Sequence, residues 1–312
     1  WLGEKYSEAL ATLEYGIQQD KGFLLLTGGE GVGKTFIINV LLSRLDEGII
    51  PLTIAEPVSD CLDFFSILSR ESKMSRKFDS RGDFLIHFKT FLHTANSQDK
   101  KIVLIIDDAQ NMSNELLEEI RLLSNIELED AKLINILFVG RKNFNTILTQ
   151  DSNFALRQGI GIRYHLDLLN IIETYAYIEH RLETAGSDGE IFTSKAVGRI
   201  HFFSKGSPRL INDICDCALK KGYLSRVEKI DAIEIDDCVQ DLDLLVESGD
   251  EELQVIEYIE NDEQSISLSH KEKRLNWIRF GLAVTILCLL GIGALVVYSV
   301  YFNQSLSSTI TK

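Results

Sequence analysis

The sequence predicts an α/β fold in which helices cover both faces of a parallel sheet, followed by a small α-helical lid and one C-terminal transmembrane helix. Three observations predict it. Short apolar runs alternate with amphipathic stretches as far as about residue 170, helical patterns alone follow, and residues 280–302 carry no charged side chain. Short apolar strands separated by helices are typical of parallel sheets that are buried on both faces.

The individual elements follow from this alternation. An opening helix is expected because Tyr6, Leu10, Leu13 and Ile17 recur at helical spacing and line one face. We expect strands at residues 23–26, 49–54, 102–106, 134–139 and 162–166, with helices between them at 35–45, 62–71, 84–94 and 113–124. Three further helices, near 171–185, 193–204 and 207–223, form the predicted lid.

The domain organisation has six expected segments. They are an α/β domain (1–168), a helical lid (169–245), an acidic linker (246–270), a basic juxtamembrane segment (271–279), a transmembrane helix (280–302) and a short tail (303–312). The 23 uncharged residues of the span are enough to cross a hydrocarbon core of about 30 Å. Four basic residues precede the span and only Lys312 follows it, which predicts a cytoplasmic N-terminal side. We expect the chain to be a fragment whose periplasmic tail is truncated.

The net charge of -15 comes from one tract. Between residues 230 and 270 there are fourteen Asp and Glu and no Lys or Arg. Removing these fourteen from the 47 acidic residues leaves 33, against 32 Lys and Arg, so the rest of the chain is nearly neutral. We interpret the tract as a solvated segment. The five cysteines show no paired spacing, which favours a reducing compartment.

A glycine-rich loop, "LTGGEGVGKTF", follows the first predicted strand. The spacing Gly28-x4-Gly33-Lys34-Thr35 matches the phosphate-loop (Walker A) pattern, and the loop lies between a strand and a helix as the pattern requires; a simple chain turn is the alternative. Lys34 is expected at the β and γ phosphates and the Thr35 hydroxyl at Mg²⁺. The expected nucleotide-binding residues are Gly28, Gly29, Glu30, Gly31, Val32, Gly33, Lys34, Thr35 and Phe36.

Two carboxylates end a second apolar strand, in "KKIVLIIDDAQ". Such a pair alone is more often a turn or a helix cap, but its position some seventy residues after a phosphate loop favours a catalytic role. We expect Asp107 to hold Mg²⁺ and Asp108 to orient or deprotonate the attacking water.

An arginine is expected in the first turn of a lid helix, in "SKGSPRLIN". Ser207 is a good N-cap and Pro208 suits the first helical position, which places Arg209 directly after them. From the lid, Arg209 can fold over a nucleotide and contact the γ phosphate; an ordinary solvated arginine is an equal alternative at this point.

Seven stretches stand in a fixed order over about residues 2–235: "EALATLEYGI", "LTGGEGVGKT", "LIIDDAQNMSNELLEEIRLLSNIE", "LRQGIGIRYHL", "YIEHRL", "IFTSKAV" and "GSPRLINDICD". Together they resemble the AAA+ ATPases of the general secretion pathway A (ExeA-like) family. The resemblance implies an enzyme that binds and hydrolyses ATP with Mg²⁺, as a homo-oligomer. It implies that Arg209 is the second sensor arginine and that Arg157 is an inter-subunit arginine finger.

The resemblance also implies a place in the cell. Members of this family are tethered to the bacterial inner membrane and serve the assembly of envelope machinery. The expected partners are therefore components of a secretion, pilus or polysaccharide-export machine, with the ATPase domain in the cytoplasm.

The chain departs from the family pattern at three positions. The family usually has Asp-Glu where this chain has Asp107-Asp108, so the base is one methylene shorter; a displacement of about 1 Å can cost about 10²-fold in rate. Arg141 stands where the family commonly has Gln, which puts the first sensor in doubt, and Gly159 replaces a second candidate finger arginine. ATP binding is therefore expected more firmly than fast hydrolysis.

Three functions remain to be compared. The leading hypothesis is a membrane-tethered ATPase for envelope assembly, and the second is an oligomeric scaffold that binds ATP but hardly hydrolyses it. The third is a DNA-binding ATPase of the transposition or replication type. A small basic excess in the lid supports the third, but the strongly acidic tract follows it, so nucleic acid is not the expected partner.

Overall fold

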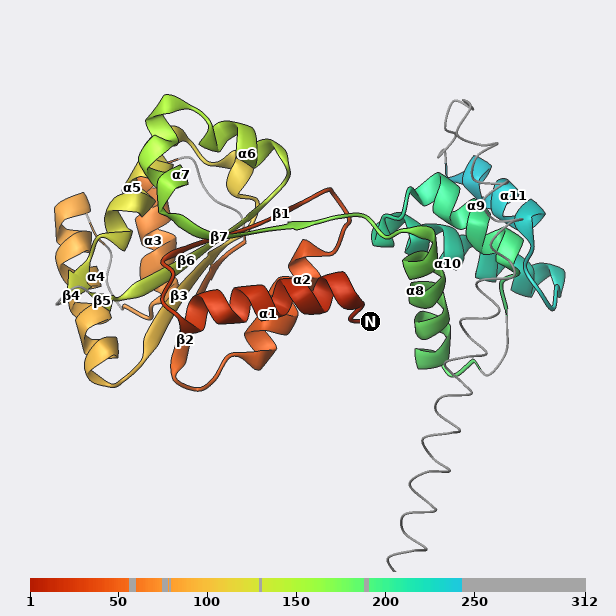
Figure 1. Ribbon diagram of the computed structural model, residues 1–312, viewed down its shortest axis with the longest axis horizontal. Coiled ribbons are helices and arrows are strands. Elements are labelled where there is room, and N and C mark those ends of the chain that lie inside the picture. Colours follow the sequence, from red (N-terminus) through yellow and green to blue (C-terminus); the bar gives the residue numbers. More distant parts are fainter. Residues whose placement is uncertain (56–59, 75–77, 79, 129–130, 188–190, 243–312) are drawn as a thin grey trace, which may run out of the picture. The chain divides into compact units, whose positions relative to one another are not determined.

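The computed structural model describes residues 1–242, except 56–59, 75–77, 79, 129–130 and 188–190 (Figure 1). The predicted acidic linker, juxtamembrane segment, transmembrane helix and tail lie outside the described residues. Within the described residues, no helix is both long enough and apolar enough to span a membrane.

A five-stranded parallel sheet forms the centre of the α/β domain. Its order is β2 (Ile49–Ile54), β3 (Lys101–Ile106), β6 (Ile134–Gly140), β1 (Phe23–Gly28) and β7 (Ile160–Leu166). Neighbouring strands all pair in parallel. All five predicted strands are confirmed, with ends within about two residues of the expected ones. A short antiparallel pair, β4 (Glu127–Leu128) and β5 (Ala131–Lys132), was not predicted.

Helices cover both faces of the sheet (Figure 1). One face packs against α1 (Glu4–Gln18) and α2 (Lys34–Arg44). The other packs against α3 (Cys61–Glu71), α4 (Arg81–Ser97), α5 (Asn114–Ser124), α6 (Asn143–Leu148) and α7 (Phe154–Gly159). Two 3₁₀ turns, Ala109–Asn111 and Asp151–Asn153, complete the domain.

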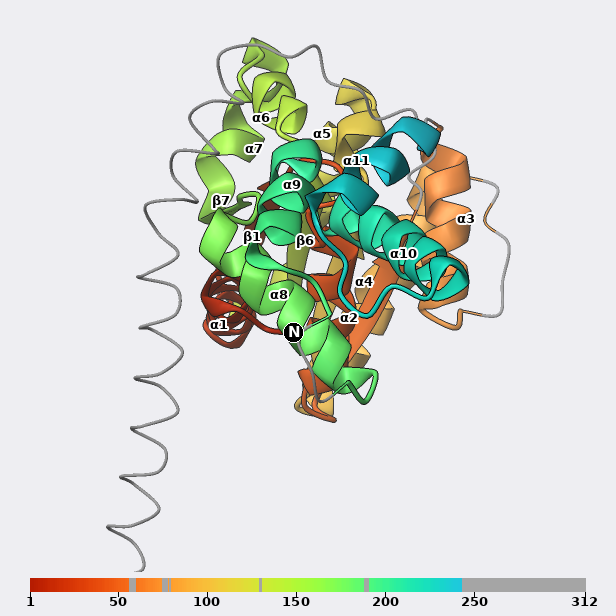
Figure 2. The same cartoon turned by 90° about the vertical axis from the view of Figure 1, so that its right-hand side faces the viewer.

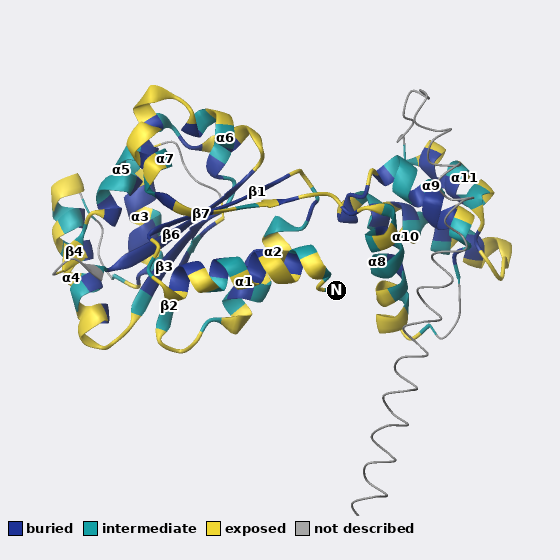
Figure 3. Cartoon of the chain, in the orientation of Figure 1, coloured by how far each residue is buried: buried dark blue, intermediate teal, exposed yellow. Residues whose placement is uncertain are grey.

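The strand residues divide between these two cores. Along β1, Phe23 and Leu25 face one core, and Leu24 and Leu26 face the other. Both sets are buried, as Figure 3 shows for the sheet in dark blue. This is why the central strands β1, β3 and β6 are almost continuously apolar in the sequence, whereas the edge strand β7 alternates buried and exposed residues.

Four helices form the lid: α8 (Ile171–Thr184), α9 (Ser194–Ser204), α10 (Pro208–Ser225) and α11 (Ala232–Asp241). Three were predicted and are confirmed. Figure 2 shows all four helices, and α9 packs against each of the other three.

The fourth helix, α11, corrects the interpretation of residues 230–270 as a solvated segment, which was wrong for 232–241. Ile235, Cys238 and Val239 are buried against the lid at helical spacing. The acids of α11 occupy its outer side, where Asp236 pairs with Arg199 at 2.8 Å and Asp241 pairs with Lys221 at 2.6 Å. The many acidic residues of the tract mask this apolar stripe in the sequence.

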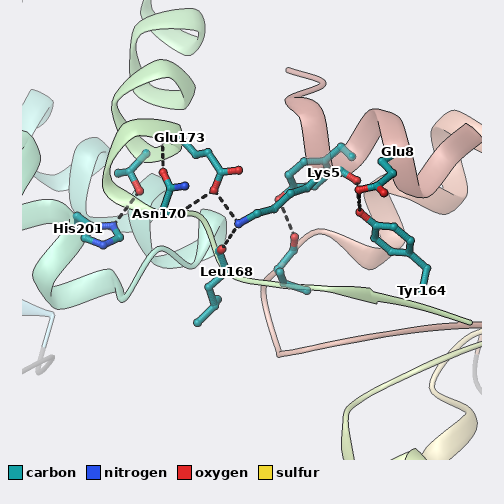
Figure 4. Close-up of polar contacts among 10 residues, drawn as sticks. Lys5, Glu8, Tyr164, Leu168, Asn170, Glu173 and His201 are labelled. Atoms are coloured by element: carbon teal, nitrogen blue, oxygen red, sulfur yellow. Dashed lines mark hydrogen bonds and ion pairs between the residues drawn. The ribbon is translucent and has the colours of Figure 1, made fainter. Parts of the chain in front are cut away.

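The first turn of α1 contacts the start of the lid (Figure 4). Lys5 Nζ donates to the Leu168 carbonyl at 3.0 Å and to Glu173 Oε2 at 2.8 Å. Glu173 also closes a capping box with Asn170 at the beginning of α8. The connection from β7 to the lid is therefore held in place by hydrogen bonds from α1.

Candidate nucleotide-binding site

The glycine-rich loop connects β1 to α2 and packs against the lid. The backbone N–H of Arg209 donates to the Gly31 carbonyl at 3.3 Å. Gly31 has a φ of +71°, and a Cβ there would lie 2.8 Å from both Arg209 Cβ and Ser207 Oγ. The absence of a side chain at Gly31 therefore permits the first turn of α10 to approach the loop. Ser207 stands at the predicted N-cap position, although its hydroxyl accepts no capping hydrogen bond.

Lys34 begins α2, and its ammonium lies within the curve of the loop. Its Nζ donates to the carbonyls of Gly28 at 3.1 Å and Gly29 at 2.8 Å. Burial lowers the pKa of Lys34, against the opposing charges of Asp107 and Asp108. An ammonium that is partly desolvated next to backbone carbonyls is suited to exchange those carbonyls for phosphate oxygens.

Thr35 and Asp107 meet at the carboxyl edge of the sheet. The Thr35 hydroxyl donates to Asp107 Oδ2 at 3.2 Å, and Asp107 Oδ1 accepts the backbone N–H of Asp108 at 2.9 Å. Burial raises the pKa of Asp107, although both hydrogen bonds oppose the shift. One hydroxyl and one carboxylate are a donor set that fits Mg²⁺, which keeps several water ligands when it binds with substrate phosphates.

Asp108 follows Asp107 with a left-handed backbone (φ 50°). Its Oδ1 accepts a hydrogen bond from Gln110 Nε2 at 2.8 Å. The other end of that amide, Gln110 Oε1, accepts the backbone N–H of Arg141 at 2.9 Å. The predicted base is thus held by a glutamine that also binds the end of β6.

Glu30 connects two arginines above the loop. Its Oε1 lies 3.3 Å from Arg209 Nη1, and its Oε2 lies 3.0 Å from Arg141 Nη1. The three residues come from the loop, the end of β6 and the lid, so the structure places Arg209 beside the loop. Glu30 was expected in the loop, but no local sequence pattern indicates its two arginine partners.

Arg157 lies on α7, and its interactions are local. Its guanidinium carbon is 5.5 Å from the centre of the Phe154 ring, and its carbonyl accepts a hydrogen bond from Arg163 at 2.8 Å. A finger arginine acts on a neighbouring subunit, so a single chain does not test this assignment.

A pocket of about 370 Å³ opens beside the loop, between α1, α2, α8 and α10. Its walls include the aromatic residues Trp1, Tyr6, Phe36 and Tyr177. Trp1 makes edge contacts with Tyr6 at 5.7 Å and Tyr177 at 5.5 Å, and Tyr6 donates a hydrogen bond to the Val32 carbonyl at 2.8 Å. A mainly apolar, aromatic pocket next to a phosphate loop is suited to a nucleoside.

Of these aromatic residues, only Phe36 was in the predicted site. Trp1 and Tyr177 lie 176 positions apart in the sequence, and no local pattern connects them. Helical spacing assigned Tyr6 to a buried face, and this assignment is confirmed, but spacing did not indicate that its ring would border a pocket.

Comparisons with known proteins agree with this geometry. A family model described as an AAA domain matches residues 17–148. General secretion pathway protein A from Aeromonas hydrophila is 35% identical over 231 residues, which are 74% of this chain and 42% of that protein. The chain therefore spans less than half the length of this relative.

Solved structures resemble the chain in fold. Cdc6p from Pyrobaculum aerophilum has a TM-score of 0.62 at 16% identity, over 81% of this chain and 70% of the other. The Aeropyrum pernix ORC2 protein, in a structure of its ADPNP–ADP complexes, has a TM-score of 0.58 at 14% identity, over 80% and 69%. Both likenesses support an α/β AAA+ fold with a helical lid.

Proposed function

Because this chain is an ExeA/GspA-like AAA domain protein, we propose that it binds ATP with Mg²⁺ and hydrolyses it. One observation carries the proposal. Lys34 and Thr35 begin α2 directly after the loop, and Asp107 directly follows β3; Lys34 bonds two loop carbonyls, and Thr35 bonds Asp107. This is the set of groups that holds phosphates and their metal ion in phosphate-loop enzymes.

Each residue has a separate part in the proposed reaction. Lys34 exchanges the loop carbonyls for phosphate oxygens, and Thr35 and Asp107 hold the metal ion. Mg²⁺ supplies charge neutralisation at the phosphates. Asp108 orients the attacking water, Arg209 contacts the γ phosphate from the lid, and Arg157 acts on the site of a neighbouring subunit in a homo-oligomer. The aromatic pocket takes the nucleoside.

We further propose that the ATPase serves a machine of the bacterial envelope. The support is the relative named general secretion pathway protein A, of which this chain matches 42%. The uncharged residues 280–302 would tether the chain to the inner membrane, with the ATPase domain in the cytoplasm. The proposed partners are secretion, pilus or polysaccharide-export components.

A second candidate is an oligomeric scaffold controlled by ATP binding, with little turnover. The geometry of Asp108 favours it, because one of its carboxylate oxygens already accepts from Gln110. The shorter side chain and this hydrogen bond both act against the activation of water.

ATP affinity and hydrolysis should be measured together on the wild type, Lys34→Ala and Asp108→Glu. We expect Lys34→Ala to lose both binding and turnover, because Lys34 supplies the ammonium that lies within the curve of the loop. Turnover in the wild type supports the ATPase. If the wild type binds ATP without hydrolysing it, and Asp108→Glu hydrolyses ATP, the scaffold is supported. Absence of ATP binding in the wild type contradicts both.

A further inference from the structure

A chain of three polar side chains lines the aromatic pocket beside the loop. Arg181 and Tyr177 lie one turn apart on α8, and Asn212 lies on α10. Arg181 Nη1 donates to the Tyr177 hydroxyl at 3.4 Å, and that hydroxyl donates to Asn212 Oδ1 at 3.0 Å. The guanidinium carbon of Arg181 also lies 5.9 Å from the centre of the Tyr177 ring. Two helices of the lid are therefore connected by hydrogen bonds in the wall of the pocket.

These hydrogen bonds fix the orientation of the Asn212 amide. A phenolic hydroxyl has one proton, and a guanidinium can only donate. Because Arg181 donates to the Tyr177 hydroxyl, the hydroxyl proton goes to Asn212, and the amide oxygen faces Tyr177. The amide nitrogen, Nδ2, makes no hydrogen bond within the part of the chain that the structure describes. Asn212 is half-buried and lines the pocket, so this N–H donor is available to a ligand there.

The place of Asn212 on α10 suits a contact with a base. Asn212 follows Arg209 by three residues, so the two side chains lie on the same face of the helix, about 4.5 Å apart along its axis. Arg209 lies at the phosphate loop, where its backbone N–H bonds to the Gly31 carbonyl. Asn212 lines the pocket together with Tyr6 and Tyr177. Phosphate loop and aromatic pocket thus follow one another along α10 in the order of the phosphates and the nucleoside in a nucleotide.

We propose that Asn212 Nδ2 donates a hydrogen bond to a ring nitrogen of adenine, and that Tyr177 holds the amide in the orientation that makes this contact. The inference rests on the proposed function, in which this pocket takes the nucleoside. It adds a residue that selects the base.

The chemistry of the base explains why the orientation of the amide matters. The ring nitrogens of adenine present a lone pair and no proton, so they accept from an N–H group and repel a carbonyl oxygen. An amide turned the other way would lose the hydrogen bond and place its oxygen against the base. One such hydrogen bond changes affinity about three- to tenfold. Tyr177 and Arg181 act on the base through Asn212 and are therefore positioning residues.

The test is calorimetric titration of the full chain, in Mg²⁺, with ADP and with deaza analogues in which N1, N3 or N7 of the base is replaced by C–H. ADP carries the same base as ATP and has no γ phosphate to lose. The base ratio is the dissociation constant of an analogue divided by that of ADP. We expect a base ratio of about three to ten for one analogue in the wild type, and that analogue identifies the nitrogen that Asn212 contacts.

The variants separate the proposed contact from a general effect on the lid. Asn212→Ala removes the donor and should bring the base ratio to about one, whereas Tyr177→Phe keeps the ring and should lower the ratio, because the amide can then turn over. A general loss of affinity changes both dissociation constants and cancels in the ratio. Two controls should keep the wild-type ratio. Asn145→Ala alters a half-buried asparagine of α6 that does not line this pocket, and Tyr223→Phe alters a tyrosine of α10 that is 85% exposed.

A second substitution at the same position keeps the test decisive if Asn212→Ala does not fold. Asn212→Asp retains an oxygen for the Tyr177 hydroxyl and replaces the donor with another oxygen, so the base ratio should fall to about one or below.

Each part of the inference has an outcome that overturns it. Wild type that binds ADP, with base ratios near one for all three analogues, overturns the inference alone. A raised ratio that persists in Asn212→Ala or Asn212→Asp overturns the contact of Asn212, and one that persists unchanged in Tyr177→Phe overturns the role of Tyr177. Wild type that binds neither ADP nor ADPNP overturns the proposed function, and this inference with it.

Discussion

Thr35 and Asp107 form the contact on which the proposed metal site depends. Thr35→Val keeps the shape of the side chain but removes the hydroxyl that donates to Asp107 at 3.2 Å. We expect the variant to bind ADPNP equally in Mg²⁺ and in EDTA, because a ligand of the metal is lost. Titrations in both conditions provide the measurement. Thr90→Val is the control, because its hydroxyl donates to the Ile86 carbonyl one turn earlier in α4. A wild-type difference that persists in Thr35→Val would contradict the site.

His201 in the lid predicts a pH dependence of stability. A hydrogen bond of 2.9 Å joins its Nδ1 to the Thr174 hydroxyl, and burial lowers the pKa of the ring below 6.5 (Figure 4). The unfolded chain then binds a proton that the folded lid does not, as the pH falls below 6.5. This stability is present above 6.5 and is lost as the pH falls toward the lowered pKa.

The measurement is urea unfolding of the wild type and His201→Asn at pH 7.5 and pH 5.5. Asn keeps a hydrogen-bonding group for Thr174 but does not titrate in this range. We therefore expect the wild type to lose more stability than His201→Asn between the two pH values. Equal losses in the two proteins would show that His201 stays neutral in both states or charges in both.

The residues of the site differ in how well the sequence predicts their positions and partners. Lys34 and Thr35 are fixed by their spacing from the glycines, because the loop is one continuous segment. The partners of Glu30 are not, because Arg141 and Arg209 reach it from a strand end and from the lid. Contacts of this kind depend on the completed fold.

The same distinction applies to the secondary-structure elements. Four of the strands were predictable because each is a short, mostly apolar run next to a helical pattern, and the edge strand β7 because its apolar residues alternate with polar ones. Helices α6 and α7 were not, because each has six residues, too few to establish a periodicity. Helix α11 has ten residues and a clear apolar stripe, but it lies within the acidic tract.

Helix α11 leads to a prediction about the lid. Ile235 is fully buried and Ile233 is 71% exposed, although the two residues lie on the same helix. We expect Ile235→Ala to lower the free energy of unfolding by about 2–5 kcal/mol, because it leaves a cavity against α9 and α10. The matched Ile233→Ala should change it by no more than about 0.5 kcal/mol. Chemical unfolding measures both values, and equal effects would contradict a packed α11.

Across the described part of the molecule, the pocket beside the loop is made from two regions. Trp1, Tyr6 and Phe36 come from the first two helices and the chain before them, and Tyr177 and Arg209 come from the lid. A ligand in this pocket must therefore contact both regions, and its affinity depends on how firmly they are held together. Lys5 holds them together through Glu173 and the Leu168 carbonyl.

The chain contains a second lysine of the same kind, which permits a matched test of this coupling. Lys101 donates to one carboxylate, Asp20 at 2.7 Å, and to one carbonyl, Gln18 at 2.7 Å. It begins β3, at the end of the strand opposite to Asp107. Lys5→Met and Lys101→Met each remove one ion pair and one hydrogen bond to a carbonyl, and each should cost about 1 kcal/mol of stability.

We expect only Lys5→Met to weaken nucleotide binding. Loss of the Lys5 contacts lets the start of the lid move away from α1. The pocket walls then have the binding arrangement in only a fraction of the molecules, and the apparent nucleotide affinity falls in proportion to that fraction. ADPNP titrations of both variants, beside their unfolding curves, provide the measurement. If Lys101→Met weakens binding as much as Lys5→Met, the loss follows general stability and the lid contact has no separate part in binding. If affinity falls in Lys5→Met alone, Lys5 contributes to the nucleotide site through the lid, by its bonds to Leu168 and Glu173.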